Sequence, residues 1–250
     1  MLFLLPLLLL LAACAPAPKT PEPAPQKTAA YQVDPATAGV IRGSIKFTGK
    51  KPAAKTISLD ADAQCAKLHP GGTITEEGVI LAANGAVGNV FVYLKSGLEG
   101  KHFPAPTVPV VIDQKGCWFA PRVLGMQTGQ PLKVTNSDPV THNIHPQPQK
   151  NRDWNQSQSP EDLPLQRKFT APEIMIPIKC NVHNWMHAWL GVLDHPYFAV
   201  TGADGSFEIR NVPPGNYTVA VWQETLGAEE QSVTLAPAAK TDLTFTFKGK

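Results

Sequence analysis

Short runs of alternating apolar and polar residues dominate this chain from about residue 40 onward. In residues 40–47, Ile41, Ile45 and Phe47 share one face of an extended segment, because side chains alternate across a strand. Gly- and Pro-containing turns separate the runs, and only residues 61–68 are predicted to form a short helix. The other predicted strands are 89–94, 108–112, 132–136, 174–179, 190–193, 206–209, 217–222 and 243–247. The pattern predicts an all-β protein built from sandwiches or barrels.

The N-terminal segment predicts export. Residues 1–13 are apolar but too short to span a bilayer, which is typical of a signal peptide. They end in Leu-Ala-Ala before Cys14, which resembles the lipobox of bacterial lipoproteins. That resemblance implies a lipid anchor on Cys14. Because Ala15 follows it, the resemblance also implies that the protein is attached to the outer membrane and faces the periplasm. A plain cleaved signal peptide with an incidental Cys14 is the alternative.

Residues 14–37 are rich in proline and are expected to form an extended linker between the lipid and the folded part. The remaining stretch of about 210 residues suits one large or two small domains. The chain has 22 Lys and Arg against 20 Asp and Glu, with a net charge of +2. No basic run occurs, so nothing indicates a nucleic-acid partner.

The motif that carries the most chemistry is C-x2-H-x2-M at residues 180–186. It supplies a thiolate, an imidazole and a thioether, and a further imidazole is available upstream in T-H-N-I-H at 141–145. One Cys, two His and a weak axial Met form the ligand set of a blue-copper site. Each residue alone has a plainer interpretation as core packing or as a surface histidine. The joint pattern favours copper.

Two other histidines compete as ligands. His145 lies three residues after His142 and on a strand would point to the opposite face. His187 directly follows Met186 and is an alternative axial ligand. A third possibility is a non-blue site in which water replaces Met186 and small molecules react.

Residues 86–195 resemble the cupredoxin family. The similarity rests on Phe119, Pro121, the segment 129–132, Asn136, H-N-I-H at 142–145, Phe169 and the 180–186 loop. This loop is similar to the short C-x2-H-x2-M loop of amicyanins. The resemblance implies a Greek-key β-sandwich that binds one type 1 copper ion. The implied ligands are His142, Cys180, His183 and Met186.

Trp185 and Trp189 flank the ligand loop. We expect them to form an apolar docking face beside a partly exposed edge of His183, with core packing as the alternative. If Cys14 carries lipid and Cys180 binds metal, Cys65 and Cys117 remain. An exported compartment permits a disulfide between these two, although two buried free thiols would fit the sequence as well.

Residues 196–250 resemble the carboxypeptidase regulatory-like or transthyretin-like β-sandwich. The similarity lies in the turn motifs T-G-A-D-G-S-F at 201–207 and V-P-P-G-N-Y at 212–217. Residues 43–49 resemble the first strand of the same module. We therefore expect a second small sandwich that is split into 38–85 and 196–250, with the cupredoxin inserted between its parts.

These expectations combine into an exported, lipid-anchored carrier of single electrons. It is not expected to be an enzyme, because four protein ligands leave no open position for a substrate. The expected partner is a redox protein, namely a c-type cytochrome, a membrane oxidase or a periplasmic dehydrogenase. The alternatives are copper delivery or storage, with exchangeable metal in a solvent-open site, and a structural or adhesion module with no metal.

Overall fold

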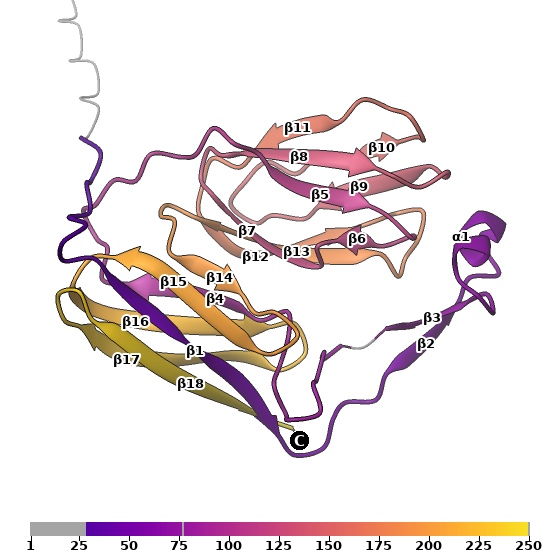
Figure 1. Cartoon of the computed structure of the whole chain (residues 1–250). Coiled ribbons are helices and arrows are strands. Elements are labelled where there is room, and N and C mark those ends of the chain that lie inside the picture. The colour runs from indigo at the N-terminus through magenta and orange to yellow at the C-terminus, as the bar shows by residue number, and fades with distance from the viewer. Residues whose placement is uncertain (1–28, 77, 250) are drawn as a thin grey trace, which may run out of the picture.

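The computed structural model describes residues 29–76 and 78–249. The predicted signal peptide (1–13), Cys14 and most of the predicted linker therefore lie outside the described residues. The described chain is almost entirely β-structure, which confirms the all-β prediction. It forms two sandwiches joined by close packing, a terminal sandwich built from both ends of the described chain and a central sandwich built from its middle (Figure 1).

The terminal sandwich consists of a sheet in the order β15-β1-β18 and a sheet in the order β14-β4-β16-β17. Its strands are β1 (Gly39–Thr48), β4 (Phe91–Ser96), β14 (Phe198–Val200), β15 (Ser206–Val212), β16 (Gly215–Gln223), β17 (Gly227–Leu235) and β18 (Lys240–Lys248). Ile41, Ile45 and Phe245 of one sheet are buried against Val92 and Val219 of the other. The strand predicted from Ile41 and Ile45 thus turns its apolar face inward, as the alternation requires.

The central sandwich packs a sheet in the order β10-β9-β12-β13-β7 on a sheet in the order β11-β8-β5-β6. Its strands are β5 (Val110–Gln114), β6 (Phe119–Ala120), β7 (Val123–Gln127), β8 (Pro131–Asn136), β9 (His142–Pro146), β10 (Gln156–Gln158), β11 (Leu165–Lys168), β12 (Glu173–Lys179) and β13 (His187–Leu193). Ile112 and Leu132 face Ile176 and Leu190 across its core. The core thus comes from alternating residues of both sheets.

The predicted boundary at residue 86 differs from the structure. Strand β4 pairs with β16, with Leu94 opposite Val219 and Val92 opposite Val221. Val92 and Leu94 are buried in the core of the terminal sandwich. The first strand of the central sandwich is therefore β5. The predicted boundary is too early because the apolar alternation of β4 fits either core and does not specify its partner strand.

The predicted assignment of 38–85 to the terminal sandwich is correct only in part. After β1 the chain leaves that sandwich as β2 (Lys55–Ser58), α1 (Ala63–Leu68) and β3 (Thr73–Glu76), and we call residues 55–76 the excursion. Figure 1 shows β2 and β3 side by side, with α1 at their far end beside the central sandwich. Leu59, Cys65 and Ile74 of the excursion are buried in the core of the central sandwich. The predicted helix at 61–68 is present as α1.

A third apolar cluster joins the two sandwiches. Phe91 of β4 packs with Val123, Met175 and Leu193 of the central sandwich. Phe91 also stacks on Phe198 with ring centroids 5.8 Å apart. The interface therefore contains aromatic rings from the terminal sandwich, packed against aliphatic residues and Trp189 of the central one.

The end of the predicted linker is tied to the terminal sandwich. Tyr31 donates a backbone hydrogen bond to the carbonyl of His102 (2.7 Å), and its ring meets Phe103 edge-on at 5.6 Å. Among the residues that the structure describes, no helix is long and apolar enough to cross a membrane.

Candidate metal centre

The four predicted ligands lie at the end of two adjacent strands of one sheet and on the loop that follows one of them. His142 begins β9, and Cys180 directly follows β12, which pairs antiparallel with β9. His183 and Met186 lie on the short loop that connects β12 to β13. The backbone N–H of Cys180 donates to the carbonyl of Met186 (3.0 Å), and that of Met186 donates to the carbonyl of His183 (3.0 Å). These bonds hold the loop compact at the end of a rigid hairpin.

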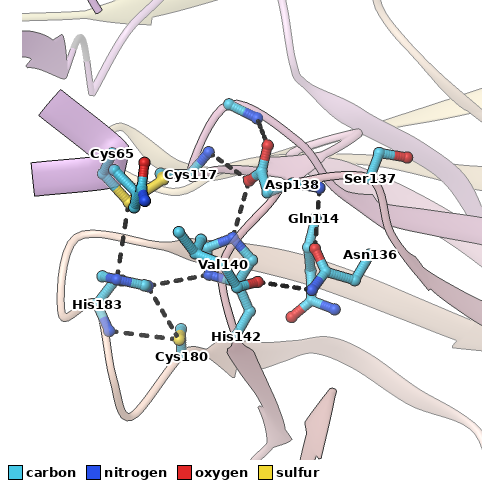
Figure 2. A network of polar contacts seen from close by, with 12 residues as sticks. Cys65, Gln114, Cys117, Asn136, Ser137, Asp138, Val140, His142, Cys180 and His183 are labelled. Atoms are coloured by element: carbon cyan, nitrogen blue, oxygen red, sulfur yellow. Dashed lines mark hydrogen bonds and ion pairs between the residues drawn. A yellow bond between two sulfur atoms is a disulfide. The ribbon is translucent and has the colours of Figure 1, made fainter. Parts of the chain in front are cut away.

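The structure brings the thiol and both imidazoles together in the core (Figure 2). The Nδ1 atoms of His142 and His183 are 2.9 Å apart, and Cys180 Sγ lies 3.9 Å from His183 Nδ1. The ligand atoms of these three residues all lie within 4.8 Å of one another. Their relative exposures are 0%, 2% and 2% for His142, His183 and Cys180, and Met186 is 0% exposed in the same apolar cluster.

Each imidazole has a carboxylate on its outer nitrogen. His142 Nε2 lies 2.8 Å from Asp138 Oδ2, and His183 Nε2 lies 3.0 Å from Asp62 Oδ2. A carboxylate accepts a hydrogen bond from Nε2–H, which leaves the lone pair of a neutral imidazole on Nδ1. Because two N–H groups cannot face each other at 2.9 Å, at least one Nδ1 must carry a lone pair. The donor set thus fits a single metal ion between the two Nδ1 atoms and Sγ.

Asp138 is a buried carboxylate with a full set of donors. Burial raises its pKa, but the hydrogen bonds from His142 and from the backbone N–H groups of Cys117 and Gly116 outweigh burial and lower the pKa overall. The two backbone bonds measure 2.7 and 2.6 Å. Asp138 therefore remains ionised and holds His142 in one orientation.

The Cys180 thiol is prepared for ionisation. Burial raises its pKa, but hydrogen bonds with His142 and His183 lower it to about 6. The backbone N–H of His183 also donates to Sγ at 3.3 Å. A thiolate is the form that binds metal, so these donors favour metal binding near neutral pH.

The structure joins Cys65 to Cys117 by a disulfide across 52 residues of sequence. The backbone of Cys117 makes two hydrogen bonds beside the predicted ligands. Its N–H donates to Asp138, and its carbonyl accepts from the indole N–H of Trp185 at 3.1 Å. Within the described part of the chain, Cys180 is the free cysteine.

The predicted docking face is wrong in this structure. Trp185 is 8% exposed and packs in the core with the disulfide. Trp189 donates to Glu224 Oε2 at 2.8 Å and packs on Trp222, with ring centroids 5.0 Å apart, so it lies at the junction of the two sandwiches. The expected exposed edge of His183 is also absent among the described residues, because Asp62 and Cys65 cover it.

The competing histidines have other partners. His145 Nε2 lies 3.1 Å from Asp153 Oδ1, on the outer side of β9. His187 Nε2 lies 2.8 Å from Glu76 Oε1, and its Nδ1 bonds to the carbonyl of Trp185 at 2.9 Å. Neither ring belongs to the cluster of possible metal ligands.

Sequence reasoning missed both carboxylates. Asp138 lies four residues before His142, a spacing that offered a usable signal. Asp62 is the second residue of the predicted helix and the N-cap of the observed α1, but nothing in the sequence places it beside a histidine 121 residues later.

Residues 193–248 match the family model of the carboxypeptidase regulatory-like domain. This confirms the resemblance predicted for 196–250. A comparison with curated proteins finds no match to the chain.

Solved structures of copper proteins are similar to parts of the chain. A Cu-containing nitrite reductase (NirK) from Thermus scotoductus SA-01 is 20% identical over 39% of this chain and 24% of that chain, with a TM-score of 0.33. A purple cupredoxin from Nitrosopumilus maritimus is 19% identical over 33% of this chain and 98% of that chain (TM-score 0.29). An oxidised amicyanin mutant is 17% identical over 40% and 97% (TM-score 0.31).

Proposed function

We propose that this protein binds one type 1 copper ion and carries single electrons. The observation that supports this most is the convergence of His142 Nδ1, His183 Nδ1 and Cys180 Sγ within 4.8 Å. Met186, the fourth proposed ligand, is buried in the same cluster. One-electron transfer is the chemistry that copper would supply here, because thiolate and thioether donors suit Cu(I) and imidazoles suit both oxidation states.

The protein's own contribution is a site that is organised before metal binds. Asp138 fixes His142, and the backbone bonds of the 180–186 loop fix Cys180 and Met186. A preformed donor set needs little rearrangement when the metal changes oxidation state. Four protein ligands also leave no position for a substrate, so we propose a carrier rather than an enzyme.

We further propose that the protein works outside the cytoplasm, anchored through lipid on Cys14 to the outer membrane and facing the periplasm. A disulfide between Cys65 and Cys117 is consistent with an oxidising compartment. Its electron partner would be a c-type cytochrome, a membrane oxidase or a periplasmic dehydrogenase. The burial of the ligands does not favour copper delivery, which needs an exchangeable, solvent-open site.

Voltammetry of the copper-loaded protein tests this proposal. We expect one reversible one-electron wave and rapid electron exchange with a small c-type cytochrome in solution. Asp60→Asn, an exposed change in the turn before α1, should leave both unchanged. Copper that binds but gives no reversible wave would contradict an electron-carrier function.

A further inference from the structure

His183 is covered by a segment that belongs to neither sheet of the central sandwich. Asp62, the N-cap of α1, lies in the excursion. Its Oδ1 accepts the backbone N–H groups of Gln64 (2.8 Å) and Cys65 (2.9 Å), while its Oδ2 lies 3.0 Å from His183 Nε2. The start of the helix thus fixes one carboxylate oxygen, and the imidazole occupies the other.

The excursion is fastened over the site by several contacts. The disulfide with Cys117 holds Cys65, whose Sγ lies 3.7 Å from His183 Nε2 (Figure 2). At the other end of α1, His69 Nε2 lies 2.8 Å from the carbonyl of Gly116. Leu59 is also fully buried in the core of the central sandwich. The helix cannot leave His183 while these contacts persist.

We propose that the excursion is a disulfide-tethered cap on the copper centre, in which Asp62 is a positioning residue for the ligand His183. The inference rests on the proposed function. The Asp62 carboxylate accepts a hydrogen bond from His183 Nε2–H, which leaves the Nδ1 lone pair of His183 for copper and would make the imidazole a stronger donor. A stronger donor favours Cu(II) over Cu(I). Asp62 therefore holds copper more tightly in its oxidised state and lowers the reduction potential.

The cap has a second consequence for electron transfer. Because His183 is 2% exposed, a partner cannot touch its imidazole edge directly. Asp62, which contacts His183 Nε2, has a side chain that is 27% exposed and therefore links the imidazole to the surface. The cap therefore sets the distance between the metal site and any partner that docks on this face.

The variant Asp62→Asn tests the positioning role. Asparagine is as good an N-cap as aspartate, so α1 is retained while the carboxylate is lost. We expect affinity for Cu(II) to fall by about 10–100-fold, the typical effect of losing such a partner, and the reduction potential to rise. Asp60→Asn is the matched control, since Asp60 is an exposed residue of the same turn. It should leave both quantities unchanged.

The tether is tested with Cys65→Ser combined with Cys117→Ser. Without the disulfide, the potential should rise as it does in Asp62→Asn, and adding Asp62→Asn should cause little further change, because both act on one contact. Fully additive shifts in the reduction potential would contradict the proposal that the disulfide acts through the Asp62–His183 contact. If the cysteine variant does not fold, Asp62→Asn still decides the positioning role with the disulfide intact.

Nitrogen NMR of the metal-free protein separates this inference from the proposed function. The His183 ring should carry its proton on Nε2, with slow exchange into solvent that accelerates in Asp62→Asn. A wild-type protein that shows this tautomer but forms no type 1 site would overturn the proposed function and leave the cap in place. An Asp62→Asn protein identical to Asp60→Asn in affinity, potential and tautomer would overturn the cap's role.

Discussion

At the scale of single residues, the site depends on how each donor is held. Both imidazoles are oriented by carboxylates, and the thiol accepts hydrogen bonds from its neighbours. Met186 differs because it is buried in the apolar cluster of the central sandwich. We therefore expect the two histidines and Cys180 to control whether metal binds, and Met186 to adjust its properties.

Met186→Leu should retain copper and colour while raising the reduction potential. A weak axial ligand tunes the potential but does not hold the metal, and leucine fills a similar volume. His187→Ala should change the potential little, because that ring contacts Glu76 and the Trp185 carbonyl. Voltammetry measures the reduction potential of each variant. A potential that changes in His187→Ala but not in Met186→Leu would assign the axial position to His187.

Cys180 should titrate in the metal-free protein with a midpoint near pH 6, because its folded pKa is lowered to about 6 from the ordinary 9.0. Since this pKa is depressed, the thiolate contributes its full stability above pH 9, and the contribution is lost as the pH falls through about 6. Thiolate ultraviolet absorbance across this range measures the midpoint. Cys180→Ser should remove the signal, and a midpoint near the ordinary thiol value would contradict the hydrogen-bond arrangement.

At the scale of elements, the sequence predicted where the strands lie better than which strands they pair with. Every predicted strand overlaps with an observed strand, and the predicted ligands in 180–186 lie together because their spacing is local. The alternation in β4 could not reveal that Leu94 pairs with Val219 of a distant strand. In the same way, the position of Trp185 and Trp189 beside the ligand loop could not reveal that Trp185 packs with the disulfide and Trp189 packs on the other sandwich. Long-range contacts are set by tertiary packing, which the local pattern does not encode.

Gly191 of β13 and Gly125 of β7 allow the two sandwiches to approach closely. A Cβ at Gly191 would lie 2.4 Å from Phe91 Cζ, and one at Gly125 would lie 2.5 Å from Phe198 Cε2. Gly191→Ala should therefore lower the free energy of unfolding by roughly 1–3 kcal/mol through overpacking. Gly202→Ala is the control, since its nearest atom would be 3.3 Å away. Equal denaturation midpoints for both variants would show that the interface is not tightly packed.

At the scale of the whole molecule, the two sandwiches and the cap are joined by one group of ion pairs. Arg122 of the central sandwich binds Glu224 of the terminal sandwich (2.7 Å) and Glu76 of the excursion (2.9 Å). This partly buried cluster joins all three parts. The surroundings of the proposed metal site therefore depend on contacts among all three parts. The lipid anchor proposed at Cys14 lies outside the described residues.

Cys14→Ser should release folded protein into the soluble fraction without changing its colour or potential. The expected reason is that the anchor only raises the local concentration near membrane partners. Electron delivery in intact cells should fall, while self-exchange of purified protein stays the same. Cell fractionation checks the prediction, and a variant that stays wholly in membranes would refute the anchor.

The central claim is that His142, Cys180, His183 and Met186 form one type 1 copper site. Visible absorption and EPR of the copper-loaded wild type, compared with Cys180→Ser, test it most directly. We predict intense visible colour and a narrow copper hyperfine splitting in the wild type, and neither in Cys180→Ser, because a hydroxyl cannot replace the covalent thiolate bond. A wild-type protein that binds copper yet remains colourless with a broad splitting would contradict the claim.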